Sequence, residues 1–190
     1  MTGKLRQFVD AATATVAEER DEGMILDRLK GPLGDLIAVD DWLPEAFTRP
    51  HPEYYQQYLL HCDPLERFSV VSFVWGPGQK TPIHNHTVWG MIGMLRGAEI
   101  STRFAPPEEG APMAALGDDR LDPGDIDLVS PDLGDYHQVR NAFDDRVSIS
   151  IHVYGSNIGR VQRQVFDGAT GTAKSFVSGF SADVMPNIWG

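Results

Sequence analysis

Two histidines separated by a single residue are the strongest chemical signal in this 190-residue sequence. His84 and His86 end the segment Gly78-Gln-Lys-Thr-Pro-Ile-His-Asn-His86, which reads as an extended, proline-containing stretch. In a strand, residues i and i+2 point to the same face, so both imidazoles can reach one point in space. Neutral imidazole is the commonest side-chain ligand of transition metals such as iron, copper, nickel and zinc. Alone, the pair would more simply be two exposed strand histidines.

A second segment changes that interpretation because it supplies a third histidine at a turn. His137 lies in Gly134-Asp-Tyr-His137-Gln-Val-Arg-Asn141. Three imidazoles make a mononuclear site possible, whereas two rarely suffice. The sequence therefore predicts a metal site formed by His84, His86 and His137.

A later segment, residues 147–154, alternates aliphatic residues with polar residues that could take part in a reaction. In Val147-Ser-Ile-Ser-Ile-His-Val-Tyr154, every other residue is aliphatic and the residues between them are polar. A solvent-facing polar side is the usual explanation in an antiparallel sheet. In a barrel, the same face can point inward, and Ser150, His152 and Tyr154 could then form a hydrogen-bonded relay in a polar pocket.

The secondary-structure elements that would position these residues can be recognised from local composition, which changes along the chain from helical to β-rich. Residues 4–20 have the apolar spacing of an amphipathic helix, and a second helical segment over residues 22–38 is interrupted by Gly31-Pro32 and Gly34. From Tyr54 onward, short β-rich runs alternate with glycine and proline, which is typical of a sandwich or barrel. The expected strands are Tyr55–His61, Arg67–Trp75, Thr87–Leu95, Glu99–Phe104, Asp125–Val129, His137–Asn141 and Val147–Tyr154, with a long loop over Ala105–Gly117.

Length and composition favour a single domain. We expect N-terminal helices over residues 1–50, a barrel core over 54–165 and a C-terminal extension over 166–190, with 42% hydrophobic residues to fill one core. A net charge of −11 argues against binding to nucleic acid or to anionic membranes. The single cysteine, Cys62, excludes an internal disulfide, and no apolar run has the length of a membrane span. These features favour a cytoplasmic protein that acts on a small molecule as a monomer or weak homo-oligomer.

The two histidine segments resemble the two motifs of the cupin superfamily, which are small double-stranded β-helix barrels. Gly78, His84, His86 and Gly97 fall in register with the first motif, but Gly90 stands where the family has a glutamate. In the second motif Gly134, His137 and Asn141 match, while Gly124 and Pro131 match with one-residue shifts. The resemblance implies an all-β cupin barrel with an N-terminal helical cover. Three histidines without the glutamate are the pattern of the thiol dioxygenases.

The spacing of Ser150, His152 and Tyr154 is similar to a triad of the cysteine dioxygenase family. Over about residues 54–163, the chain most resembles the bacterial 3-mercaptopropionate dioxygenase branch. The resemblance implies Fe(II) on the three histidines and an outer triad of Ser150, His152 and Tyr154. It implies a substrate carboxylate held by Arg163, with Arg160 as the neighbouring choice, and by Gln57 or Tyr58 upstream. Met91 is placed where animal relatives carry a cysteine joined to the tyrosine, so Tyr154 is expected to be unmodified.

The function expected from this resemblance is oxidation of the thiol of a small thiol carboxylate to the sulfinate with dioxygen, as part of sulfur metabolism. The substrate would be 3-mercaptopropionate or L-cysteine. Two alternatives remain open at this point: another three-histidine cupin dioxygenase that cleaves a carbon–carbon bond, and a non-catalytic cupin that binds a small ligand. The relay over Ser150–Tyr154 favours the first function because neither alternative needs it.

Overall fold

Two antiparallel helices form the N-terminal part of the chain in the computed structural model, which describes residues 3–189. Helix α1 spans Gly3–Glu18 and helix α2 spans Glu22–Ile37. The carboxylate of Asp21 caps α2 by accepting a hydrogen bond from the Met24 backbone N–H at 2.9 Å. Each helix buries one apolar stripe, as the spacing predicts; the buried residues are Leu5, Phe8, Val9, Ala12 and Val16 in α1 and Ile25, Leu26, Leu29, Leu33, Leu36 and Ile37 in α2.

The second helix runs through Pro32 without a break, so the expected interruption at Gly31-Pro32 is wrong. A proline inside a helix costs about 3 kcal/mol, because it lacks an N–H and its ring crowds the carbonyl four residues earlier. Burial of Leu29, Leu33 and Leu36 offsets this cost by about 1.5–3 kcal/mol per side chain. Packing therefore outweighs the local preference of the proline.

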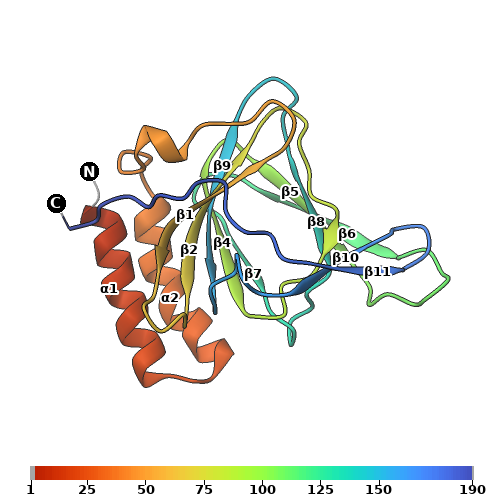
Figure 1. Ribbon diagram of the computed structural model, residues 1–190, viewed down its shortest axis with the longest axis horizontal. Helices are drawn as coiled ribbons and strands as arrows, with labels where there is room; N and C mark the ends of the chain where they lie inside the picture. The colour runs from red at the N-terminus through yellow and green to blue at the C-terminus, as the bar shows by residue number, and fades with distance from the viewer. Residues whose placement is uncertain (1–2, 190) are drawn as a thin grey trace.

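The rest of the chain forms two antiparallel β-sheets with a 3₁₀ turn, Glu45–Phe47, before them. One sheet has the strand order β1-β2-β9-β4-β7 and the other the order β11-β10-β3-β8-β5-β6. The strands are β1 Gln56–Cys62, β2 Ser69–Trp75, β3 Ile83–His84, β4 Gly90–Arg96, β5 Glu99–Phe104, β6 Ala115–Leu121, β7 Ile126–Val129, β8 His137–Asn141, β9 Ser148–Tyr154, β10 Arg163–Phe166 and β11 Ala173–Phe176. The prediction of an antiparallel β-barrel with an N-terminal helical cover is confirmed (Figure 1).

The helices cover the outer face of the five-stranded sheet, while the two sheets enclose the interior of the barrel (Figure 1). On strand β9, Ile149, Ile151 and Val153 pack in one core cluster with Leu29 and Leu33 of α2. The alternate residues of β9 must therefore face the barrel interior. All seven residues of β9 are buried, so the polar face is not the solvent-facing side that an isolated antiparallel strand would suggest.

The chain returns to its starting end after the barrel. From β11 the C-terminal segment runs back over the barrel to the helices, so the described chain ends beside α1 (Figure 1). The guanidinium of Arg6 lies 4.8 Å from the ring centre of Trp189, a distance at which a cation and an aromatic face attract.

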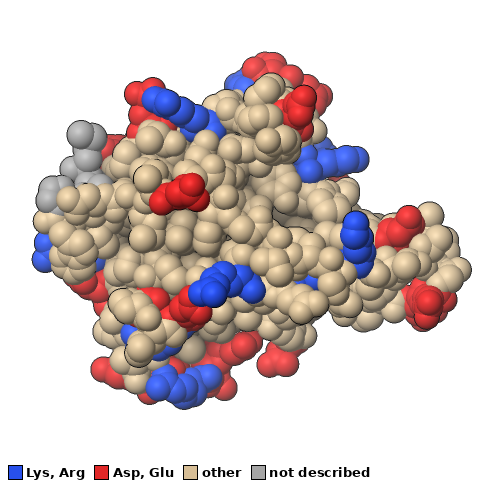
Figure 2. Space-filling view, viewed as in Figure 1, with Lys and Arg blue, Asp and Glu red and all other residues tan. Residues whose placement is uncertain are grey.

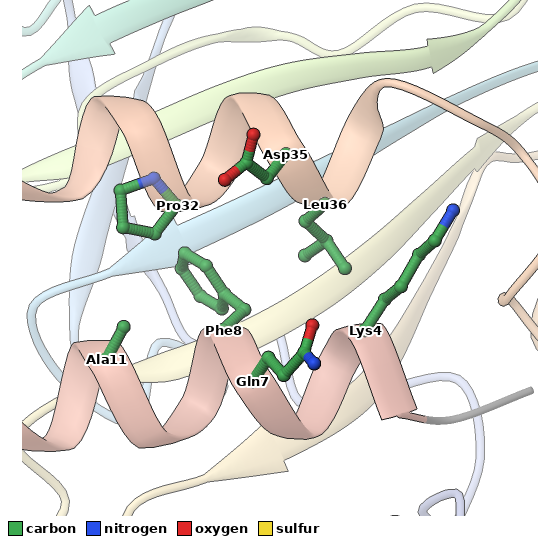
Figure 3. A pocket seen from close by; sticks show the side chains of 7 residues that line it. All are labelled: Lys4, Gln7, Phe8, Ala11, Pro32, Asp35 and Leu36. Carbon is green, nitrogen blue, oxygen red and sulfur yellow. The ribbon is translucent and has the colours of Figure 1, made fainter.

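A groove lies between the two helices, away from the barrel interior. It has a volume of about 210 Å³ and is lined by Lys4, Gln7, Phe8, Ala11, Pro32, Asp35 and Leu36 (Figure 3). Its lining contains no histidine or cysteine, and Lys4 is engaged with Asp41 at 2.7 Å. We interpret this groove as a packing gap beside Pro32 rather than as a chemical site.

Charged side chains are spread around the outline of the molecule. On the face in Figure 2, lysine and arginine lie singly among aspartate and glutamate around a broad uncharged middle. Within residues 3–189, no helix is long and apolar enough to cross a membrane.

Candidate metal centre

The structure brings His84, His86 and His137 together inside the barrel. Strands β3 and β8 are paired so that His84 and His137 are direct partners, and His86 follows two residues after His84. One ligand atom from each ring lies within 4.8 Å of the other two, and all three residues are buried. The ring centres are 4.7–4.9 Å apart, which is a spacing that one metal ion can bridge.

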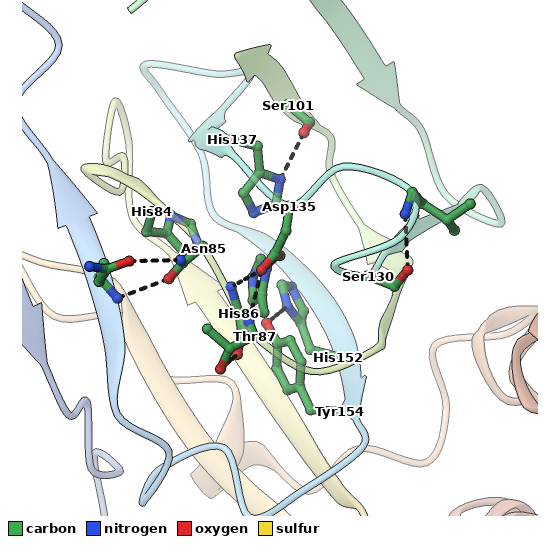
Figure 4. A network of polar contacts seen from close by, with 12 residues as sticks. His84, Asn85, His86, Thr87, Ser101, Ser130, Asp135, His137, His152 and Tyr154 are labelled. Carbon is green, nitrogen blue, oxygen red and sulfur yellow. Dashed lines mark hydrogen bonds and ion pairs between the residues drawn. The ribbon is translucent and has the colours of Figure 1, made fainter. Parts of the chain in front are cut away.

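Each ring has its Nδ1 atom occupied by another group, which leaves Nε2 for a metal. Nδ1 of His84 lies 3.1 Å from the carbonyl oxygen of Pro82. Nδ1 of His86 lies 2.7 Å from Oδ1 of Asp135, and Nδ1 of His137 lies 3.2 Å from Oγ of Ser101 (Figure 4). Such partners fix the tautomer and the orientation of metal-binding histidines. Nε2 of His137 is buried without any hydrogen-bond partner among the described residues.

Asp135 holds the first histidine segment to the second. Its Oδ2 atom accepts hydrogen bonds from the backbone N–H groups of His86 and Thr87, each at 2.7 Å, while Oδ1 faces His86 Nδ1 (Figure 4). Thr87 has a φ of 61°, which is unusual for a residue with a branched side chain. A carboxylate that binds this turn therefore both sets the turn and aims the His86 ring.

The donor set fits a divalent transition metal. Burial, together with the neighbouring histidines, lowers the pKa of His84 and of His137 well below the usual value. Neutral imidazoles are the form that binds metal. Three imidazoles whose Nδ1 atoms have other partners, with no carboxylate among them, form a ligand set of the kind used for mononuclear iron and related metals.

The position that holds glutamate in the cupin motif is filled by Gly90 for a steric reason. Gly90 is the direct cross-strand partner of Tyr154, and a Cβ atom there would lie 2.8 Å from Cδ1 of the Tyr154 ring and 3.0 Å from Val129. A side chain at position 90 thus cannot coexist with this placement of Tyr154. The missing carboxylate and the presence of the tyrosine are two consequences of one packing arrangement.

The same geometry corrects the placement of Met91 beside Tyr154. Met91 is paired with Val153 and packs in the core cluster shared with the helices. Because adjacent strand residues point to opposite faces, the residue that faces the Tyr154 ring is Gly90. The sequence contains a single cysteine, at position 62 in strand β1, and nothing at position 90 could form a bond to the tyrosine ring.

Gly90→Ala is expected to lower stability by about 1–3 kcal/mol, because the added methyl group must push the Tyr154 ring out of place. Thermal unfolding would measure this change. Gly34→Ala is the matched control: a Cβ at Gly34 in α2 meets nothing within 4 Å, so alanine there should be neutral or stabilising. Equal effects of the two substitutions would contradict the steric argument.

The relay, by which we mean Ser150, His152 and Tyr154, is a continuous hydrogen-bonded chain on the inner face of β9. Oγ of Ser150 lies 2.8 Å from Nε2 of His152, and Nδ1 of His152 lies 2.8 Å from the hydroxyl of Tyr154. The His152 ring is stacked on Phe73 with ring centres 3.9 Å apart. Burial lowers the pKa of His152 well below its usual value and raises that of Tyr154, so both side chains are neutral at neutral pH.

The relay continues beyond Ser150 to a residue that the sequence did not single out. Oγ of Ser150 donates a hydrogen bond to Oε2 of Glu99 at 2.9 Å, and the indole N–H of Trp75 lies 3.2 Å from the same Oγ. Glu99 belongs to β5 in the opposite sheet and is 1% exposed. Two residues further along β5, Ser101 contacts His137. One strand thus supports both the relay and a candidate metal ligand.

A cavity of about 220 Å³ opens beside the histidines. His84 and Tyr154 line it together with Arg163, Gln57 and six further residues: Tyr55, Phe73, Thr81, Pro82, Val165 and Phe176. A second hollow shares Tyr55 and Gln57 with this cavity and is bordered by residues 178–181 of the C-terminal segment. We interpret that hollow as the approach to the cavity from solvent.

Arg163 is a buried cation without a carboxylate partner among the described residues. It is 4% exposed, its Nη2 donates to Oγ of Ser178 at 2.6 Å, and its Nε has no partner. Its guanidinium lies 4.7 Å from the ring centre of Phe176. Burial lowers the pKa of Arg163, but guanidinium stays charged in proteins. An unpaired, largely buried cation beside a cavity is a strong attractant for an anionic ligand.

The structure distinguishes between the candidate substrate-binding residues that the sequence left open. Gln57 lines the cavity, whereas the Tyr58 hydroxyl donates to the carbonyl of Arg49 and its ring packs edge-on against Phe47. Arg160 is exposed and forms an ion pair with Glu66 at 3.1 Å. Of the two arginines considered, only Arg163 reaches the cavity.

Three polar residues that position the site were missed by sequence reasoning: Asp135, Ser101 and Glu99. Asp135 lies two residues before His137, and a carboxylate so close to a candidate ligand is a signal that could have been used. Ser101 and Glu99 sit in an ordinary alternating strand, and their roles depend on the pairing of β5 with β8 and on its contact with β9.

Comparison with known proteins gives similarity at the level of the fold. No family model matches the chain. Solved structures similar to it include the protein TT1209 from Thermus thermophilus (19% identity, 59% of this chain and 92% of that chain, TM-score 0.46). They also include an RmlC-like cupin protein from Desulfovibrio desulfuricans (23%, 60% and 92%, 0.43) and a cupin 2 domain-containing protein from Halorhodospira halophila (17%, 67% and 79%, 0.47).

Proposed function

We propose that this protein is an Fe(II)-dependent dioxygenase that converts the thiol of a small thiol carboxylate to the sulfinate. The observation that carries the proposal is the lining of one cavity by His84 of the three-histidine group, by the tyrosine end of the relay and by a buried arginine, with no carboxylate among the three histidines. In this reaction both atoms of dioxygen are added to the same sulfur. Dioxygen takes up all the electrons that sulfur loses, so no separate reductant is required.

His84, His86 and His137 would hold the iron through Nε2. When bound, Fe(II) supplies open coordination positions at which a thiolate and dioxygen can meet, and its charge favours the deprotonated thiol. The protein groups behind the ligands, Asp135 and Ser101, keep the rings in the tautomer that presents Nε2.

Arg163 and Gln57 would orient the substrate. The guanidinium offers its unpartnered Nε and a neighbouring N–H to a carboxylate, which is the bidentate geometry that arginine supplies best. A cavity of about 220 Å³ is smaller than the roughly 300–1,000 Å³ of pockets that hold drug-sized ligands. Both features suit a short acid with a thiol at its other end.

The same cavity favours 3-mercaptopropionate over L-cysteine. Its described lining contains no aspartate or glutamate that could pair with an ammonium group. Burying the cysteine ammonium beside Arg163 would leave one charge unpaired and place two cations together. A substrate without that ammonium avoids both costs.

Metal analysis combined with oxygen uptake tests this proposal. The iron-loaded protein should consume oxygen and form sulfinate with 3-mercaptopropionate, less efficiently with L-cysteine, and least with cysteamine, which lacks a carboxylate. A higher specificity constant for L-cysteine would overturn the substrate preference alone. Iron binding without any thiol-dependent oxygen uptake would overturn the reaction class and favour another three-histidine cupin dioxygenase or a ligand-binding cupin.

Tyr154→Phe is expected to keep its iron and to slow turnover roughly tenfold, because it loses one hydrogen bond worth about 1.5 kcal/mol to the reacting groups. The hydroxyl lies at the end of the relay, whereas the ring that packs against Gly90 is retained. Iron content and steady-state turnover measure the two effects separately. A Phe variant that loses iron would show that Tyr154 acts on the metal directly.

A further inference from the structure

Glu99 is a buried carboxylate with no cation bonded to it among the described residues. It is 1% exposed, and its hydrogen bond goes to the hydroxyl of Ser150. Arg103, on the same strand, is instead paired with Asp119 and Asp127. An ionised carboxylate in such a place is costly unless it has a task or can take up a proton.

The surroundings of Glu99 bring its protonation into the neutral range. Burial is the largest effect and raises the pKa of Glu99 to about 7; the negative charge of Asp127 on β7 raises it further, while hydrogen bonds from Ser150 and Trp75 oppose the rise. Strands β8 and β6 present the uncharged Asn141 and Leu121 as its cross-strand partners. The nearest other titratable groups on β9 are those of the relay, His152 and Tyr154, which are neutral.

The direction of every hydrogen bond in the relay depends on whether Glu99 is ionised. If it is ionised, it can only accept, so Ser150 donates to it. Ser150 then accepts from His152 Nε2–H, and His152 Nδ1 accepts from the hydroxyl of Tyr154. The Tyr154 proton is directed away from the cavity in this state.

If Glu99 is protonated, the chain runs the other way. Glu99 donates to Ser150, Ser150 donates to His152 Nε2, and His152 Nδ1–H donates to the oxygen of Tyr154. The Tyr154 hydroxyl is then free to donate into the cavity. Trp75 donates to the Ser150 oxygen in both states, so each arrangement keeps the chain from Glu99 to Tyr154 continuous.

We propose that Glu99 accepts, through the relay, the proton that the substrate thiol loses on binding; this inference rests on the proposed function. The oxygen of Tyr154 receives the thiol proton and passes its own to His152 Nδ1. His152 Nε2 passes its proton to Ser150, and Ser150 passes its proton to Glu99. The thiol becomes a thiolate, Glu99 becomes a carboxylic acid, and the three relay residues end as neutral as they began.

This transfer keeps the charge of the dry interior constant. A negative charge disappears from Glu99 when one appears on the thiolate, so no net charge is added to the barrel. The transfer also leaves the Tyr154 hydroxyl pointing into the cavity, where it can donate to the new thiolate. Glu99 is thus a positioning residue, since it acts on the substrate through the relay and does not touch it.

The tautomer of His152 reports the state of the relay without any turnover. We would follow its ring nitrogens by NMR in the full-length protein loaded with Zn(II), which is diamagnetic. In the wild type, His152 should change from the Nε2–H to the Nδ1–H tautomer as the pH falls through about 7. Adding 3-mercaptopropionate above that transition should cause the same change.

Glu99→Gln should leave the tautomer independent of pH, because an amide of the same shape cannot take up a proton. Asp127→Asn is the matched control: it removes a half-buried carboxylate near Glu99 that is outside the chain of hydrogen bonds. In that variant the transition should remain but move to lower pH. Should Glu99→Gln fail to fold, Ser150→Ala breaks the chain while Glu99 stays in place, and it should also abolish the transition.

Calorimetric titration of the iron-loaded protein without oxygen gives a second readout. In buffers of different ionisation enthalpy, 3-mercaptopropionate should release its thiol proton to the buffer below the transition but not above it. The Glu99→Gln protein should release it at every pH. A tautomer transition that persists in Glu99→Gln, or thiol binding without a tautomer change, overturns the inference. Absence of oxygen uptake in a protein that shows both effects would overturn only the proposed function.

Discussion

His137→Ala protein is expected to contain no iron and to oxidise no thiol, with both quantities reduced more than about 100-fold. Changes to groups that merely orient a metal ligand already cost about 10–100-fold in metal affinity or activity, so loss of a ligand should cost more. His137 has no hydrogen-bond partner at Nε2 among the described residues, so metal binding is the interaction that this atom is placed to make. Iron analysis and oxygen uptake on the same preparation measure the two losses together.

His51→Ala is the control for this experiment. His51 stacks on Tyr54, at 3.9 Å between ring centres, in a loop before β1, and should be dispensable for iron. Ser101→Ala should have an intermediate effect, because it removes only the partner of His137 Nδ1. Full iron occupancy in His137→Ala would show that the three-histidine assignment is wrong. Iron loss in His51→Ala as well would indicate a general effect of losing a histidine.

The parts of the fold that carry a clear alternation could be predicted from the sequence. Strands β5 and β8 have the predicted bounds, because turn residues flank them and one face is buried. Strand β6 was assigned in part to a loop, since six of its seven residues are exposed and no apolar alternation marks it. Strand β6 lies at the edge of its sheet, where pairing on one side suffices to hold a polar segment.

Strands β3, β10 and β11 were missed for a different reason. They have two, four and four residues, and in these three segments too few residues show a periodic pattern. They nevertheless place His84 and Arg163, because β10 pairs with both β3 and β11. Sequence spacing thus identified the chemical groups, whereas tertiary pairing decides which of them meet.

The polar residues behind the candidate metal ligands and the relay also depend on tertiary pairing. His84, His86 and His137 could be found because their residue type is rare and their spacing is diagnostic. Glu99 and Ser101 could not, because a glutamate and a serine in a strand are usually surface residues. Only the enclosure of β5 against β9 turns them into buried groups with a chemical role.

Arg163→Ala is expected to lower kcat/KM for 3-mercaptopropionate and for L-cysteine by roughly 150-fold, largely through KM, and to leave cysteamine almost unchanged. The factor corresponds to about 3 kcal/mol, which is the upper range for hydrogen bonds to a charged group. The selectivity between substrates follows because cysteamine has no carboxylate for the guanidinium to bind. Steady-state kinetics with the three thiols measures the effect.

Arg160→Ala is the matched control, since Arg160 lies three residues away, is exposed and pairs with Glu66. It should leave all three substrates unaffected. Misfolding is distinguished from loss of binding by thermal unfolding. Arg163 is a buried cation without a carboxylate partner in the described part of the chain, so its removal relieves a desolvation cost that offsets the lost contact with Phe176. A similar loss for cysteamine and for the acids would show that Arg163 supports the cavity rather than the carboxylate.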